Sequence, residues 1–270
     1  MSESKHPVRI GIQLQPQHAD YAQIRDAVRR AEDLGADIAF NWDHFYPLSG
    51  DPHGKHFECW TMLGAWAEQT SRIQIGALVT CNSYRNPELL ADMARTVDHM
   101  SGGRAILGIG AGWFEKDYEA YGYEFGTPGS RLADLGEALP RIEHRLAQLN
   151  PAPVGDLPVL IGGGGERKTL RLVARHADIW HSWSDAEVLR HKMEVLRGHG
   201  EAVGRDISEI EVSVGVGGTG GGKVPARPGE VGPGLLAQGA SLFTLGASGP
   251  DYDMTGFEEW IAWRDEVNGT

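Results

Sequence analysis

The chain alternates short apolar runs with longer amphipathic stretches along its whole length. The runs that we interpret as strands are Val8–Leu14, Ile38–Asn41, Ile73–Leu78, Ala105–Gly110, Val159–Gly162, Ile179–His181, Ile210–Val216 and Leu242–Leu245. The stretches that we interpret as helices are Tyr21–Leu34, Cys59–Gln69, Pro87–Met100, Ser130–Leu149, Lys168–His176, Asp185–Val203 and Phe257–Val267. This rhythm predicts one α/β domain over residues 1–270, a (β/α)8 TIM barrel. The alternative is a doubly wound open sheet, which the count of eight strands and the lack of an early GxGxxG turn disfavour.

Charge and cysteine content narrow the classes of partner. The 270 residues include 25 Lys and Arg against 37 Asp and Glu, a formal net charge of −12, so we expect neither nucleic acid nor a membrane as a partner. Cys59 and Cys81 form no metal-binding pattern and suit a reducing compartment. No secretory signal is expected, and no apolar run approaches the ~18 residues of a membrane span. We therefore predict a cytoplasmic protein that acts on a small molecule.

Polar and aromatic residues follow most of the predicted strands. In a TIM barrel the site lies at the carboxyl ends of the strands, in the loops that lead into the helices. The segments at these positions are Gln13, Gln15 and Gln17; Asn41–Phe45; Thr80, Asn82, Tyr84 and Arg85; Gly110–Trp113; Gly162–Gly165; and His181–Trp183. Six such loops at one rim predict a binding cleft.

A glycine run marks the passage from the fifth strand into the next helix. Gly162–Gly165 is followed by Glu166, Arg167 and Lys168. Backbone N–H groups can crowd around an anion in such a loop, and the helix N-terminus adds a favourable partial charge. We interpret the run as a phosphate site to which Arg167 and Lys168 could add charge. A flexible tight turn is the alternative.

Asp43 and His44 follow the second strand, where a barrel enzyme places catalytic groups. A histidine can hold or give a proton near neutral pH, and a neighbouring carboxylate can tune it. A surface histidine is the alternative interpretation. A metal site of His44, His53 and His56 is weak, because neither the spacing nor a carboxylate motif supports it.

Four tryptophans, Trp42, Trp113, Trp180 and Trp183, lie near predicted strand ends. Aromatic walls suit a planar heteroaromatic ligand, whereas capping of the barrel core is the alternative and fits Trp180 well. The tryptophans on predicted helices are interpreted as packing residues, and both cysteines as structural.

These residues together carry a family resemblance. The matching segments are Arg9–Ile12, Trp42–Phe45, Tyr84–Pro87, Ser101–Arg104, Leu107–Trp113 with Glu115, Pro158–Gly164 and His176–Asp178. In this order they resemble the luciferase-like monooxygenase superfamily, and within it the actinobacterial oxidoreductases that use the deazaflavin coenzyme F420. The match runs across most of the chain.

The resemblance implies a barrel, usually a homodimer, with a flavin or deazaflavin ring in the barrel mouth. It implies that Gly162, Gly163, Gly164 and Gly165 hold the cofactor's phosphate and that Gly110 and Gly112 line the turn after the fourth strand. A bulge with a non-proline cis peptide behind the ring is expected at Ala77–Leu78, within one residue. The ring-contacting Asp and His of the family correspond to Asp43 and His44, and Thr80 to a polar position near the ring edge.

Two departures leave the substrate open. The glutamate that acts as an acid in the sugar-phosphate dehydrogenase branch is replaced by Trp113, and a later asparagine by Lys116, so that activity is not transferred. The segment between the seventh and eighth predicted strands, which includes Gly217–Gly222, is short and glycine-rich where relatives often carry a longer substrate-covering insertion.

The sequence therefore predicts an oxidoreductase that transfers hydride between F420 and an unidentified small organic substrate. His44 would be the proton donor or a polarising group beside the ring, and Asp43 would orient His44 or bond the ring. The substrate pocket is predicted to contain Trp42, Trp113, His181 and Trp183. The alternatives are an FMN-dependent monooxygenase, a non-catalytic F420-binding protein and, disfavoured by the missing ligand set, a metal-dependent hydrolase.

Overall fold

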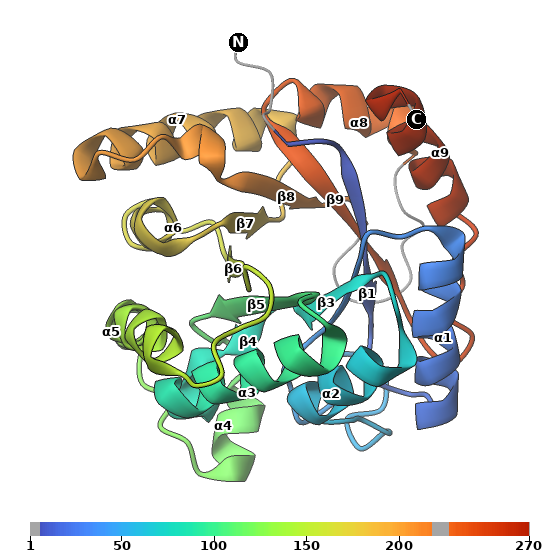
Figure 1. The fold of residues 1–270 in the computed structure, drawn as a ribbon, viewed down its shortest axis with the longest axis horizontal. Coiled ribbons are helices and arrows are strands. Elements are labelled where there is room, and N and C mark those ends of the chain that lie inside the picture. The colour runs from blue at the N-terminus through green and yellow to red at the C-terminus, as the bar shows by residue number, and fades with distance from the viewer. Residues whose placement is uncertain (1–5, 218–226, 270) are drawn as a thin grey trace.

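Parallel strands close into a barrel with helices around it in the computed structural model, which describes residues 6–217 and 227–269 (Figure 1). The strands are β1 (Arg9–Leu14), β2 (Ile38–Asn41), β3 (Gln74–Ala77), β4 (Thr80–Cys81), β5 (Ala105–Gly110), β6 (Val159–Gly162), β7 (Ile179–Ser182), β8 (Glu211–Gly215) and β9 (Ala240–Ala247). The α-helices are α1 (Tyr21–Leu34), α2 (Cys59–Gln69), α3 (Pro87–Ser101), α4 (Glu115–Tyr121), α5 (Pro128–Gln148), α6 (Thr169–His176), α7 (Ala186–Val203), α8 (Pro228–Leu236) and α9 (Phe257–Asn268). Two short 3-10 helices cover Asn82–Tyr84 and Ile207–Glu209.

The strand order shows that the sheet closes on itself. Around the barrel the strands run β3-β2-β1-β9-β8-β7-β6-β5, and β3 pairs with β5 to complete the circle. Every pairing in this circle is parallel, and β4 extends the line of β3 along β5. The predicted (β/α)8 barrel is therefore confirmed, and the open sheet is wrong.

Local signals set the helix boundaries. Asn86 accepts a hydrogen bond from the amide of Leu89 at 3.1 Å, which caps α3, and Pro87 occupies the first turn, where its missing N–H costs nothing. Gly102 ends the same helix in a left-handed conformation with φ 69°. The helix therefore begins and ends at residues whose chemistry favours those positions.

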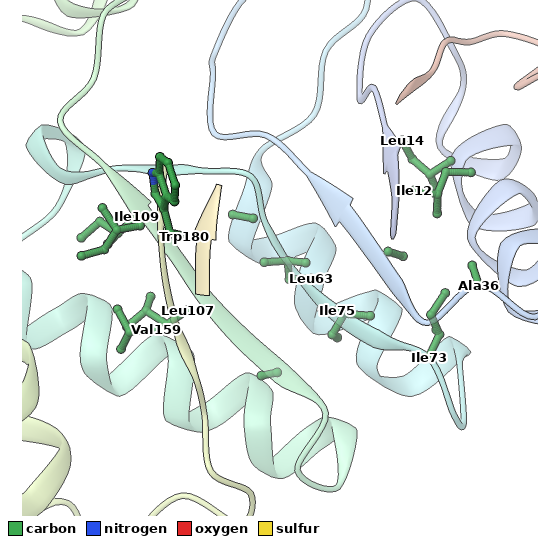
Figure 2. Close-up of a cluster of buried hydrophobic side chains, with 14 of the residues drawn as sticks. Ile12, Leu14, Ala36, Leu63, Ile73, Ile75, Leu107, Ile109, Val159 and Trp180 are labelled. Atoms are coloured by element: carbon green, nitrogen blue, oxygen red, sulfur yellow. The ribbon is translucent and has the colours of Figure 1, made fainter. Parts of the chain in front are cut away.

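The hydrophobic core has two layers because successive side chains of a strand point to opposite faces. One layer fills the barrel interior and consists of Ile38, Phe40, Leu78, Ile106, Leu160, Ile179 and Leu242. The other lies between strands and helices, and Figure 2 shows part of it, including Ile12, Leu63, Ile75 and Trp180. Nearer the carboxyl ends of the strands, polar residues and glycines such as Gln13, Gly110, Gly162, His181 and Thr244 line an opening of the interior.

The third strand departs from the prediction. We expected one run over Ile73–Leu78, but regular pairing stops at Ala77 and resumes only in β4. The peptide bond between Leu78 and Val79 is cis, one residue beyond the expected Ala77–Leu78 and within the stated margin. The periodicity of an apolar run carries no signal for such a break.

Glycines on the neighbouring strands make room for this break. A Cβ on Gly108 would overlap the carbonyl oxygen of Ala77. A Cβ on Gly110 would lie 2.7 Å from Val79 Cγ2, and one on Gly162 would lie 2.9 Å from Val79 Cγ1. These three glycines therefore have a packing reason that is independent of any ligand.

Two helices were not expected. Helix α4 is short and follows the glycine turn after β5. Helix α8 contains Pro233, and a proline inside a segment is a signal against predicting a helix there. The glycine-rich segment Gly217–Gly222, which we interpreted as a shortened loop, lies outside the described residues except for Gly217.

Candidate active site

A cavity of about 760 Å³ opens at the carboxyl ends of the strands, where a barrel places its site. Its volume falls within the usual range for small-molecule pockets. The structure brings together the following predicted site residues on its wall: Trp42, Asp43, His44, Leu78, Thr80, Gly110, Gly112, Trp113, Gly162, Gly163, His181 and Trp183. Three predicted residues, Ala77, Gly164 and Gly165, belong to adjoining segments but do not line it.

The break after β3 is held at the cavity by polar contacts. Gln13 Nε2 donates to the carbonyl oxygen of Leu78 at 2.8 Å, which fixes the cis peptide from the first strand. Thr80 is fully buried, and its hydroxyl accepts from Trp60 Nε1 at 3.2 Å. The hydroxyl predicted to lie near a ring edge therefore already has a partner within the protein.

Asp43 is engaged by an arginine. Arg85 donates to both of its carboxylate oxygens, at 2.5 and 2.9 Å, and the amide of Cys81 adds a third bond at 2.9 Å. Burial acts against the charged guanidinium, but the hydrogen bonds and charge of Asp43 raise the pKa of Arg85 above its ordinary value. Arg85 also reaches Glu58 at 2.9 Å. Asp43 is thus neutralised by the protein itself.

His44 is oriented by Asp117 rather than by its neighbour Asp43, which corrects one of the two roles predicted for Asp43. The Nδ1 atom of His44 lies 2.8 Å from Asp117 Oδ2, and Asp117 is fully buried. The same carboxylate accepts from the Tyr84 hydroxyl at 3.0 Å and from the Phe45 amide at 3.2 Å. Burial first, and the nearby negative charge of Asp117, raise the pKa of Tyr84 above its ordinary value.

Sequence reasoning missed Asp117 because it lies 73 residues from His44. It belongs to α4, where its neighbours Glu115 and Glu119 make it resemble one more acid on a solvated face. Only the matching Glu115 nearby marked this stretch as part of a family motif.

His181 lies on the inward face of β7. Its Nδ1 atom is 2.8 Å from Ser213 Oγ, whereas Nε2 is buried and has no hydrogen-bond partner among the described residues. Burial lowers the pKa of His181 to about 3, so the ring is neutral. Trp183 packs perpendicular to it with ring centroids 4.6 Å apart.

The glycine loop after β6 is ordered by its own contacts. The Gly163 amide donates to the His181 carbonyl at 3.0 Å, and its carbonyl accepts from Trp180 Nε1 at 2.8 Å. Lys192 Nζ donates to the Gly164 carbonyl at 2.6 Å, which places an unpredicted cation at the loop. The Gly163 amide is therefore engaged within the protein, whereas the amides of Gly164 and Gly165 form no hydrogen bond among the described residues.

One charged residue of the wall was not predicted. Arg131, in the first turn of α5, is only 5% exposed and lines the cavity. It donates through Nε to the Gly112 carbonyl at 3.1 Å and through Nη1 to the Phe125 carbonyl at 2.7 Å. It makes no ion pair with any described residue. An arginine near a predicted helix start has no local signal for such a position.

The described residues contain no group of three or more His, Cys, Asp or Glu that could hold a metal ion. Of the three histidines weighed as a weak metal site, His56 accepts through Nε2 from Trp42 Nε1 at 3.0 Å. Burial, and then the nearby His44, lower the pKa of His56 to about 4. None of the described helices is long and apolar enough to cross a bilayer.

Comparison with known proteins decides the family. The model of the family described as luciferase-like monooxygenase matches residues 4–217. The chain belongs to this family. The resemblance inferred from the sequence motifs is therefore confirmed.

Individual relatives are similar over part of their length. An F420-dependent glucose-6-phosphate dehydrogenase of Amycolatopsis mediterranei is 33% identical over 134 residues, 49% of this chain and 40% of that protein. The chain matches 61% of the length of an uncharacterised mycobacterial relative and 52% of an archaeal 5,10-methylenetetrahydromethanopterin reductase.

Two solved structures show the same fold. An F420-dependent secondary alcohol dehydrogenase in complex with an F420-acetone adduct has a TM-score of 0.79 at 18% identity, covering 97% of this chain and 98% of that one. A riboflavin lyase with modified FMN and riboflavin has a TM-score of 0.73 at 12% identity, covering 98% and 96%.

Proposed function

We propose that this luciferase-like protein is an F420-dependent oxidoreductase that transfers hydride to or from a small organic substrate. The observation that carries the proposal is the cavity at the strand ends, where His44 is fixed by a buried carboxylate beside the break after β3. The F420-dependent relative and the F420-bound structure neighbour support the choice of cofactor.

The described residues fit a cofactor with a ring and a phosphate. Leu78 and Val79 form a wall backed by glycines, against which a flat ring can lie. Gly162–Gly165 and the start of α6 would hold the phosphate, as helix N-termini do. Asp43, Thr80, Gly110 and Gly112 would adjoin the ring, whereas Ala77 would act through the backbone behind it. When bound, F420 supplies the hydride donor or acceptor.

The chain's own contribution to the chemistry is a proton at His44. With Nδ1 held by Asp117, Nε2 is the nitrogen available to a ligand in the cavity. A neutral His44 that donates from Nδ1 accepts a proton at Nε2, and a protonated His44 gives one to a carbonyl or imine acceptor. Asp117 fixes the tautomer and the ring orientation of His44, as a carboxylate does for a catalytic histidine.

The cavity mouth favours a substrate with a flat apolar surface. Trp113 and Trp183 line the cavity and are 62% and 49% exposed, unusually high for tryptophan. Together with Trp42 they would exclude water from the ring and contact a planar ligand. His181 would contribute a neutral polar group to the same pocket.

Titration of the purified protein with oxidised F420, followed by cofactor fluorescence, tests the proposal directly. We expect saturable binding at micromolar concentrations, and no binding at tens of micromolar would overturn it. FMN is titrated in parallel, because the riboflavin lyase neighbour holds modified FMN. Tighter binding of FMN, with a yellow protein, would favour the monooxygenase alternative.

Replacing His44 separates an enzyme from a cofactor-binding protein. We expect His44→Ala to bind F420 nearly as the wild type does but to lose turnover in a screen of reduced F420 against carbonyl and imine compounds. A non-catalytic binding protein would show no turnover in either form. The homodimer implied by the family is measured on the same samples by light scattering.

A further inference from the structure

Gln15 is a buried polar residue of the cavity wall, directly after β1. It is only 5% exposed. Its backbone is fully used, because the amide donates to the Ala247 carbonyl at 3.0 Å and the carbonyl accepts from the Tyr252 hydroxyl at 2.7 Å. The backbone of Gln15 is therefore fixed by the fold, and only its side-chain amide is left to interact with a ligand.

The neighbouring Gln17 decides which end of the Gln15 amide is already bonded. The backbone amide of Leu48 donates to Gln17 Oε1 at 2.8 Å, so the other end of the Gln17 side chain is its nitrogen. This nitrogen donates to Ser49 Oγ at 2.9 Å and to Gln15 Oε1 at 3.4 Å, and Ser248 Oγ donates to the same Oε1 at 2.9 Å. Because both contacts engage Oε1, the Nε2 atom is the free end of Gln15.

This nitrogen is not covered by the protein. Among residues 6–217 and 227–269, Gln15 Nε2 has no hydrogen-bond acceptor. The nearest position on β9 is a glycine, and a Cβ added to Gly246 would lie 3.8 Å from Nε2. Gly246 is exposed, whereas the other residues of β9 are buried. A buried amide with unused donors costs stability, so it is expected where a ligand supplies the acceptor.

The same contacts place Gln15 beside the loop that carries His44. Strands β1 and β2 are neighbours in the barrel, and the Gln17 side chain bonds to Leu48 and Ser49 of the loop that follows β2. Leu48 lines the cavity together with Gln15 and His44. Adjoining segments thus offer the cavity a fixed N–H donor and a histidine that can exchange a proton. A carbonyl oxygen can accept from both kinds of group.

We propose that Gln15 Nε2 donates a hydrogen bond to a carbonyl oxygen of an uncharged substrate. The proposal rests on the proposed function, in which His44 exchanges a proton with the substrate, and it adds a specificity residue and a substrate class. Because Nε2 is a donor only, it leaves an ammonium or protonated imine without a partner. The adjoining wall, Leu48 and residues 244–246, is uncharged, so a carboxylate placed there would be desolvated without a counterion.

Two small probes of the same shape test the donor. Acetophenone and α-methylstyrene differ only in a C=O group against a C=CH2 group. Calorimetry measures their binding to the wild type, Gln15→Met, Gln15→Glu and the control Gln148→Glu, which changes an exposed residue of α5. We expect the wild type and the control to bind acetophenone about three- to tenfold more tightly than α-methylstyrene, and Gln15→Met to lose this preference.

Gln15→Glu tests the same contact by a gain of binding. One carboxylate oxygen keeps the contacts with Gln17 and Ser248, and the other replaces the free donor with a charged acceptor. With benzamidine, a planar cation, as the third probe at pH 8, we expect this variant alone to bind about tenfold more tightly than the wild type. Misfolding cannot produce such a gain. The same probe affinities in all four proteins would overturn the proposal.

F420 titrations of the four proteins separate this proposal from the proposed function. We expect equal F420 affinities, because the donor is assigned to the substrate. Weaker binding of F420 by Gln15→Met would show that the cofactor uses the donor and would overturn the proposal. Failure of the wild type to bind F420 would remove the proposed function instead, and the probe preferences would still decide whether Gln15 binds a carbonyl oxygen.

Discussion

The two halves of the cavity wall differ in whether their polar side chains have partners within the protein. The half that follows β2 and β3 contains Asp43 and His44, and each is paired with another side chain of the protein. The half that follows β5, β6 and β7 contains Arg131 and His181, and each keeps a nitrogen without a partner among the described residues. We call these the paired half and the unpaired half.

The difference separates what folding requires from what a ligand completes. A buried charge or polar group that lacks a partner lowers the stability of the folded chain. Such a group is therefore expected mainly where a bound ligand supplies the missing partner. In the paired half the carboxylates have their partners once the chain has folded, and Nε2 of His44 is the nitrogen left for a ligand. The unpaired half keeps hydrogen-bonding capacity in reserve, which is the behaviour expected of the ligand-binding side.

Removing Arg85 should have the largest effect on stability. Arg85→Met leaves Asp43 buried at 1% side-chain exposure without its counterion, and we expect a loss of about 3–5 kcal/mol. Urea unfolding measures this loss. Arg141→Met, which breaks an exposed pair with Glu88, is the matched control and should leave the midpoint nearly unchanged. Similar midpoints for the two variants would show that Asp43 does not depend on its pair.

His181 should give the unpaired half a pH dependence. Its folded pKa of about 3 lies below the ordinary 6.5, so the unfolded chain takes up a proton first as the pH falls. The stabilisation is complete above pH 6.5, and roughly 3 kcal/mol of it should be lost by pH 4.

Urea series at pH 7, 6, 5 and 4 measure this slope in the wild type, His181→Asn and the control His53→Asn. His53 is exposed. The slope should be shallower only in His181→Asn, because His56, with a pKa of about 4, contributes equally to all three proteins. Parallel profiles for the wild type and His181→Asn would refute the role of His181.

The Tyr84 hydroxyl should matter to a smaller degree. Tyr84→Phe removes a 3.0 Å hydrogen bond to the buried Asp117, and a bond to a charged group contributes about 1.5–3 kcal/mol. Tyr121→Phe is the control, because Tyr121 is exposed and stacks on the same Phe45 ring. The two variants are compared by urea unfolding, and equal stabilities would mean that Asp117 does not need the hydroxyl.

Arg131 should be the least costly of the four to replace. Arg131→Met gives up two bonds to carbonyls but also removes an unpaired buried charge, so we expect a loss of about 1 kcal/mol in phosphate-free buffer. The comparison with Arg85→Met is the sharpest test of the two halves. A loss as large as that of Arg85→Met would show that Arg131 serves the fold rather than a ligand.

Local pattern predicted the barrel, whereas long-range contacts decided the chemistry of its site. Residues close together in the sequence are enough to recognise the helical spacing of Tyr21–Leu34 and the apolar run Ala105–Gly110. Both elements have the predicted bounds. The partners of His44 and Asp43 come from residues 73 and 42 positions away. No property of Asp117 or Arg131 as an isolated residue distinguishes it from the many exposed acids and bases of the same chain.

Val79 packs against Gly110 and Gly162, so the substitutions that these three positions tolerate depend on one another. Gly110 and Gly162 come from neighbouring strands, and each would collide with a different methyl group of Val79 if it gained a Cβ. In a library of single substitutions both glycines should score as intolerant. In the background of Val79→Ala both glycines should accept alanine. A change of shape at the cavity floor during evolution therefore requires the substitution of Val79 before that of either glycine.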